Sequence, residues 1–300
     1  MPTDRRDALQ DLTRALRDAG AIAAPRLQSP PPFAVGSPPH PPFADERHSA
    51  PPRRSYLSRW PLYVAVIVVL VAALAVPLAF GIALVQAAAP IRFGPGTAEQ
   101  SANWAGYVLT GTRFTSIKAT WTVPQVAPGT QPTEVAAFWV GLDGRGTEAL
   151  EQIGTLSGML GGTEYYAAWF EIVPNPPAYL TMDLKPGDVV TASVTAAPND
   201  QFRLRIYNHR NGQQYTTFET SKGAELVTAE VVAEAPGTLT GLAPLPDFAY
   251  VHFGQAYANG RPIGTFHWNR LTMAAGVDVQ AETSPLGRDA ASFNVIWRHQ

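Results

Sequence analysis

From about residue 100 to residue 300, apolar and polar residues alternate, and this period of two most constrains how the chain can fold. Segments 117–123, 202–206 and 227–233 place apolar side chains at every second position, as strands with one buried face do. Clusters of Gly, Pro, Asn and Asp separate such segments, as expected for turns between strands. No amphipathic helix pattern of useful length occurs in this region. The sequence therefore predicts an all-β domain, built as an antiparallel sandwich or barrel.

The first part of the chain has a different composition. Residues 21–59 hold ten prolines, which favour extended polyproline conformation over a packed core. We therefore expect residues 1–59 to be a largely disordered Pro-rich tail. Residues 60–89 carry no charge and are long enough to cross ~30 Å of hydrocarbon as a helix. They predict a transmembrane anchor, joined by a linker over 90–97 to a domain over 98–300.

Basic residues around the apolar span predict its orientation. Arg53, Arg54 and Arg59 precede the span, whereas Arg92 is the only basic residue close after it. By the positive-inside rule, the N-terminus is cytoplasmic and the C-terminal domain extracellular. The small residues that end at Ala89 resemble a signal-peptide cleavage site, so secretion after cleavage is the alternative. The length of the span and the sixty residues before it favour a retained anchor.

Charge and missing motifs exclude several function classes. Residues 1–97 carry a net charge of +4 and residues 98–300 a net charge of −6. An acidic domain lacks the clustered Lys and Arg that nucleic acid requires. The chain has no Cys, hence no disulfide framework or thiol nucleophile. GxSxG and HExxH motifs are absent, so no metal or cofactor is expected. A Ser-His-Asp triad is defined by geometry and stays open.

Carboxylates on strand-like segments remain as candidates for chemistry. By alternation, Tyr165, Trp169 and Glu171 share one face of a strand, and Glu230 points away from its neighbours Ala229 and Val231. A carboxylate among aromatic side chains is costly to bury unless it is paired or lines a wet cleft. These residues alone favour solvated strand positions over a site.

Seven segments together resemble the glutamic peptidase (eqolisin) family, in the order that the family has them. They cover essentially all of residues 101–297. The segments are 101–107 (SANWAGY), 121–124 (WTVP), 139–144 (WVGLDG), 152–154 (QIG), 166–171 (YAAWFE), 228–236 (TAEVVAEAP) and 291–297 (ASFNVIW). With the apolar span, the chain is similar to a bacterial-type member with an N-terminal membrane anchor.

The resemblance implies a fold and a mechanism. It implies a lectin-like sandwich of two antiparallel sheets with a substrate cleft, and hydrolysis of peptide bonds in acid by a Gln/Glu pair. The pair corresponds to Gln152, as the oxyanion stabiliser, and Glu230, as the general base. Four further positions correspond to residues that line or support the family's cleft: Trp139, Asp143, Trp169 and Glu171.

Two neighbours of this pair depart from the family's pattern. The family usually has Trp after the catalytic Glu and an apolar residue before the Gln, whereas this chain has Val231 and Glu151. If Gln152 faces a cleft, Glu151 points toward the core, where a lone carboxylate is costly. We expect a bulge, a partner or a displaced strand to relieve this cost.

Three functions therefore follow from the sequence. The first is a monomeric extracellular endopeptidase acting on protein or peptide substrates. The second is a catalytically impaired sandwich that binds peptide or glycan. The third is a glycoside hydrolase that uses a pair from Glu151, Glu171 and Glu230.

Overall fold

The computed structural model describes residues 95–127, 133–238 and 241–299, and the structural statements below concern these residues. The expected Pro-rich tail (1–59), the expected anchor (60–89) and most of the expected linker (90–97) lie outside them. In this described part, no helix is long and apolar enough to cross a membrane.

The described residues form β-strands and one short 3-10 helix, which confirms the prediction of an all-β domain. The first strands are β1 (Thr97–Ser101), β2 (Trp104–Thr110), β3 (Ser116–Thr122), β4 (Thr133–Asp143), β5 (Leu150–Leu160), β6 (Thr163–Ile172), β7 (Ala178–Leu180), β8 (Val189–Ala197) and β9 (Gln201–Asn208). The remaining elements are β10 (Gln214–Thr220), β11 (Ala229–Glu234), β12 (Gly237–Thr238), β13 (Gly241–Leu242), β14 (Tyr250–Ala258), β15 (Arg261–Pro262), η1 (Ile263–Thr265), β16 (His267–Ala275), β17 (Asp278–Thr283) and β18 (Phe293–Trp297).

Within the described ranges, sixteen strands form one hydrogen-bonded sheet and β12 pairs with β13 in a separate hairpin. The sheet runs β10-β9-β8-β3-β14-β18-β17-β16-β2-β11-β4-β5-β6-β7, with β1 beside β16 and β15 beside β14. The pair β1–β16 is parallel, whereas β11 pairs antiparallel with both β2 and β4.

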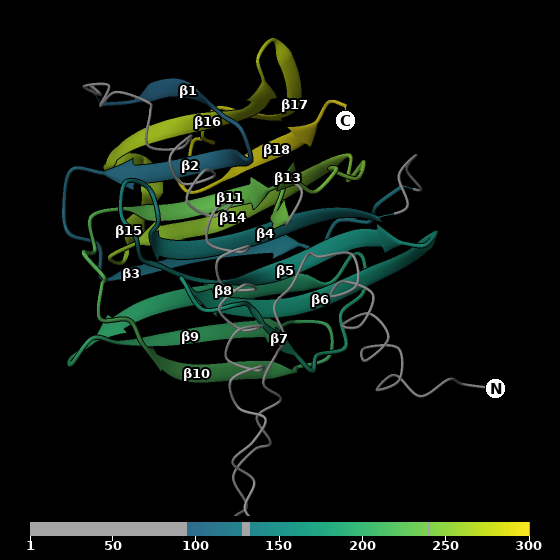
Figure 1. The fold of residues 1–300 in the computed structure, drawn as a ribbon. Helices are drawn as coiled ribbons and strands as arrows, with labels where there is room; N and C mark the ends of the chain where they lie inside the picture. Colours follow the sequence, from purple (N-terminus) through teal and green to yellow (C-terminus); the bar gives the residue numbers. More distant parts are fainter. Residues whose placement is uncertain (1–94, 128–132, 239–240, 300) are drawn as a thin grey trace, which may run out of the picture. The chain divides into compact units, whose positions relative to one another are not determined.

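The long sheet folds back on itself and forms two layers (Figure 1). Trp121 on β3 donates its indole N–H across the interior to the Thr155 hydroxyl on β5, at 3.0 Å. Phe170 on β6 stacks on Tyr215 on β10 with ring centroids 6.0 Å apart. Strands far apart along the sheet therefore meet face to face, which confirms the predicted sandwich. Its two layers are continuous because β17 and β18 carry the hydrogen-bonding pattern from one layer to the other.

Strand β4 is buried on both of its faces. Phe138, Val140 and Leu142 point into the main core between the layers. Val135 and Trp139, on the opposite face, belong to a second and smaller apolar cluster, which also includes residues of β5, β6 and β11. The outer face of the β11-β4-β5-β6 layer is therefore covered as well, and the candidate site lies on this face.

The predicted strands agree with the structure except at their ends. Segments 117–123 and 202–206 correspond to β3 and β9, whereas β11 begins at Ala229, two residues later than expected. The turn expected over 158–163 is shorter, because β5 continues to Leu160 and Gly158 pairs with Tyr165 in β6. A Cβ atom at Gly158 would come within 2.6 Å of the Tyr165 ring. This glycine gives room for a cross-strand aromatic side chain and does not mark a turn.

Candidate active site

One row of residues crosses four neighbouring strands on the outer face of this layer. Glu230 on β11 is opposite Gly141 on β4, Gly141 is opposite Gln152 on β5, and Gln152 is opposite Glu171 on β6. Because adjacent strands are ~4.8 Å apart, the Cα atoms of Glu230 and Gln152 are about 10 Å apart. Gly141 has no side chain between them. The register thus places the two predicted catalytic residues on one face, on either side of a position without a side chain.

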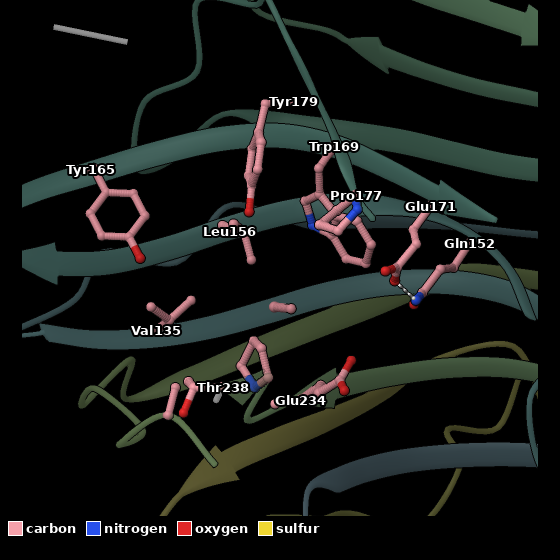
Figure 2. Close-up of a pocket in the computed structure, with 14 residues that line it drawn as sticks. Val135, Gln152, Leu156, Tyr165, Trp169, Glu171, Pro177, Tyr179, Glu234 and Thr238 are labelled. Atoms are coloured by element: carbon pink, nitrogen blue, oxygen red, sulfur yellow. Dashed lines mark hydrogen bonds between the residues drawn. The ribbon is translucent and has the colours of Figure 1, made fainter. Parts of the chain in front are cut away.

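Gln152 is held by a hydrogen bond to its neighbour in the row. Its Nε2 donates to Oε2 of Glu171 at 2.6 Å, a bond that Figure 2 shows at one end of a cleft. An amide nitrogen has two N–H donors, so one remains for a ligand. Burial raises the pKa of Glu171 to about 7, and the hydrogen bond from Gln152 opposes this rise. Glu171 thus fixes the direction of the Gln152 amide.

Glu230 is completely buried. Neither carboxyl oxygen makes a hydrogen bond within the described part of the chain. Burial raises its pKa well above the ordinary value; the nearby Thr228 hydroxyl opposes the rise, and the Asp143 and Glu151 carboxylates add to it. In this conformation the carboxyl group is neutral in acid solution. It cannot accept a proton from water until its surroundings change.

The cleft extends from Gln152 and Glu171 along β5 and β6 toward Tyr165 and has a volume of about 300 Å³. Carboxyl and amide groups lie at one end and apolar or aromatic side chains at the other (Figure 2). The polar end is lined by Gln152, Glu171 and Glu234, and the apolar end by Leu156, Tyr165 and Tyr179. The predicted cleft residue Trp169 also lines it.

The other two predicted cleft residues, Trp139 and Asp143, are fully buried beside the row. Trp139 lies on the same face of β4 as Gly141, and its indole N–H donates to Glu234 at 2.7 Å. Asp143, at the end of β4, adopts a left-handed φ of 64°. Its carboxylate accepts hydrogen bonds from the backbone N–H groups of three successive residues, 225–227, at 2.8 to 2.9 Å. These two residues support the row and do not line the cleft.

We expect Asp143→Ala to lower the free energy of unfolding by about 3 kcal/mol, because three backbone N–H groups, one of them buried, lose their shared carboxylate acceptor. The loop that enters β11 ahead of Glu230 would loosen as well. Urea denaturation of the full-length protein measures the loss, with the exposed Asp278→Ala as control. Equal stability of the two variants would contradict this role.

Glu151 points away from the cleft, as the sequence predicts for a neighbour of Gln152. It is opposite Leu142 and Ile172, and both belong to the main core. Neither a bulge nor a displaced strand occurs, because β5 pairs with β4 without a register shift. Glu151 is fully buried, and the nearby Ser221 hydroxyl opposes the rise in its pKa that burial causes. Neither carboxyl oxygen makes a hydrogen bond within the described ranges. Since Glu151 is on the opposite face, it cannot form a carboxylate pair with Glu171 or Glu230 across the cleft.

Val231 also faces the main core, because it is opposite Val140 and Tyr107. The change from the family's Trp therefore alters the packing behind Glu230 and leaves the cleft face itself unchanged. Sequence reasoning did not select Glu234 or Gly141 as site residues. A signal for Glu234 was present, because it follows Glu230 by four residues and alternation places both on one face.

No three His, Asp or Glu side chains of the described residues cluster in a way that could hold a metal ion. The chemical groups that this face offers are therefore buried carboxyls and an amide. Such groups can transfer protons and stabilise an oxyanion.

Comparisons with known proteins assign the chain to a family. Residues 102–291 match the sequence profile of the peptidase A4 family, which is more than half of the chain. The sandwich and this match define a hydrolase of the glutamic endopeptidase class. The chain belongs to the peptidase A4 family, which the seven motifs predicted.

Two curated relatives support this assignment. The chain is 28% identical to aspergillopepsin-2 of Aspergillus niger over 220 residues, which are 65% of this chain and 78% of the relative. It is 30% identical to scytalidopepsin B of Scytalidium lignicola over 137 residues, 44% of this chain and 51% of that protein. The crystal structure of scytalido-glutamic peptidase with a transition state analog inhibitor superposes with a TM-score of 0.57. It shares 21% identity and matches 67% of this chain and 100% of that chain, so this likeness shows the fold.

Proposed function

We propose that the protein is an acid-acting endopeptidase in which Glu230 is the general base and Gln152 stabilises the oxyanion. The observation that carries the proposal is the row Glu230–Gly141–Gln152 in a chain of the peptidase A4 family. The match to the peptidase A4 family supports a peptide as the substrate class.

In the proposed reaction, Glu230 takes a proton from water as the water oxygen bonds to the carbonyl carbon of the scissile peptide. The free N–H of Gln152 donates to the carbonyl oxygen as it becomes negative. Glu230 then gives the proton to the leaving nitrogen, and the C–N bond breaks. Glu171 holds the Gln152 amide throughout, so that its donor needs no reorientation.

We further propose that the peptidase domain is displayed outside the cell on an anchor over residues 60–89, as in a bacterial-type member with a cytoplasmic N-terminus. The uncharged span and the Arg residues before it support this arrangement. Protease accessibility of tags at the two ends of the chain in intact cells tests it. Digestion of the N-terminal tag, with protection of the C-terminal one, would show the opposite orientation and contradict the proposal.

The peptidase proposal is tested by digestion of a denatured protein at about pH 4 with the full-length chain. We expect Gln152→Ala to lower kcat by about 10²- to 10³-fold, the usual effect of removing one oxyanion donor, with KM nearly unchanged. The exposed Gln201→Ala serves as control. Peptide binding without turnover by the unaltered protein would favour the impaired binding function and overturn the proposal.

A further inference from the structure

The indole of Trp139 occupies the space between the two proposed catalytic residues. A Cβ atom at Gly141 would come 2.8 Å from Cζ3 of Trp139 and 2.9 Å from Cδ1 of Leu150. Cζ3 is at the end of the indole remote from Nε1, and Nε1 donates to Glu234 further along the face. The ring therefore lies lengthwise along β4, and its edge covers Gly141, the position between Glu230 and Gln152.

The Trp139 ring leaves Gln152 accessible from the cleft and Glu230 inaccessible. Gln152 borders the cleft, whereas both carboxyl oxygens of Glu230 are buried and make no hydrogen bond within the described residues. A peptide carbonyl in the cleft can thus reach Gln152 while Glu230 meets neither peptide nor water. Glu230 must gain contact with water to ionise and to act as a base. The catalytic pair is complete only after the cover over Gly141 has moved.

We propose that Trp139 is a gate between Glu230 and Gln152, and that its hydrogen bond to Glu234 controls how often the gate opens. This inference rests on the proposed function of that pair. The cleft beyond the gate is lined by the small residues Ala137 and Ala243, which leave space for the indole when it turns away from Gly141.

Two contacts hold the gate closed. The Glu234 carboxyl accepts the Trp139 N–H at 2.7 Å and also accepts from Asn103 Nδ2 at 3.2 Å. The ring of Trp104 on β2 meets the Trp139 ring edge-on, with centroids 5.2 Å apart and planes at 81°. Trp139 thus has one polar contact, with Glu234, that acid can weaken and one apolar contact, with Trp104, that acid leaves unchanged.

The polar contact depends on pH. Burial raises the pKa of Glu234 to about 7; the N–H groups of Trp139, Trp104 and Asn103 oppose the rise, and the Glu171 carboxylate adds to it. These are the charged and polar groups that β2, β4, β6 and the turn before β2 present to Glu234. Above this pH the ionised carboxylate accepts a charge-assisted hydrogen bond, which is stronger than a bond to the neutral group. Acid therefore weakens the contact and favours the open gate.

The test uses full-length protein labelled with 5-fluorotryptophan and observed by ¹⁹F NMR. Trp139→Phe identifies the Trp139 signal, and Glu234→Gln leaves only a neutral acceptor. We expect the signal of the unaltered protein to shift as pH falls through about 7, and that of Glu234→Gln to keep its low-pH position throughout. Thr155→Val is the matched control, since it removes the acceptor of the buried Trp121 N–H on the other face. A Trp139 signal that ignores pH, or one that titrates equally in Glu234→Gln, would overturn the gate.

Kinetics add a second readout. In Glu234→Gln we expect the ratio of kcat/KM at pH 4 to that at pH 7 to fall by about fivefold, the difference between a charged and a neutral acceptor. An unchanged ratio would refute control by Glu234. The NMR result stands apart from catalysis, because a gate that titrates in a protein without peptidase activity would support the gate and reject the proposed function.

Discussion

Glu230→Gln is expected to abolish acid peptide hydrolysis and to leave the fold intact. An amide cannot accept a proton from water or return one to the leaving nitrogen, so kcat should fall by about 10³-fold or more. The side chain keeps its shape, and Glu230 is fully buried, so the amide occupies the same space. Single-turnover hydrolysis of a denatured protein at about pH 4 measures the loss.

The same variant has an expected effect on stability that a merely disruptive change would not produce. Burial raises the pKa of Glu230, so the unfolded chain releases this proton at lower pH than the folded chain does. Stability from this source is present in acid and is lost as pH rises. Glu230→Gln removes the loss and should be the more stable protein at neutral pH. The exposed Glu225→Gln is the matched control, and full activity of Glu230→Gln would reject Glu230 as the base.

The second large effect concerns Glu151, the carboxyl that faces the core. Burial raises its pKa from 4.5 to about 7; the nearby Ser221 hydroxyl opposes the rise and Asp143 adds to it. The folded state therefore binds the proton more tightly than the unfolded state does. Stability is highest below about pH 4.5, falls between about pH 4.5 and 7, and stays low above, with a total loss of about 3 kcal/mol.

Glu151→Gln is expected to remove this pH-dependent loss of stability. The free energy of unfolding of the variant should therefore nearly equal that of the unaltered protein at pH 4 and exceed it by about 3 kcal/mol at pH 8. Urea denaturation at both pH values measures it, with Glu148→Gln, an exposed neighbour, as control. Activity at pH 4 should remain, because Glu151 is on the face opposite Gln152. A difference in free energy of unfolding that is equal at both pH values would show that Glu151 is not the titrating group.

Three buried carboxyl groups make the stability of the fold depend on pH in the same direction. Glu151, Glu171 and Glu234 all have pKa values raised to about 7 by burial. Each contributes a loss of stability as pH rises toward neutrality. Through these three groups, a fall in pH from neutrality stabilises the fold until the carboxyls are neutral.

Much of the fold could be predicted from local pattern. The alternation in 117–123 and 202–206 predicted β3 and β9 because a strand with one buried face repeats every two residues. The alternation of Tyr165, Trp169 and Glu171 likewise predicted one face of β6, which the register confirms. Gly158 misled the prediction of a turn, since a glycine beside an aromatic side chain reads the same in sequence as a glycine in a turn.

The candidate site was less accessible to sequence reasoning. Gln152 and Glu230 were selected by resemblance to a family, since no local rule separates them from solvated strand residues. Glu234 was not selected, although it shares the face of Glu230. Its hydrogen bond with Trp139 joins residues 95 positions apart in the chain, and strand pairing over such separations has no local signal.

The β architecture, the orientation of side chains along each strand and the family could be read from the amino-acid sequence, because they depend on period and motif. Three features became visible only in the folded chain: Gly141 lies between Glu230 and Gln152, Trp139 covers this position, and Glu151 is buried among core residues. These features depend on which strands are neighbours and in which register. Long-range pairing and packing set both, and alternation within one strand cannot encode them.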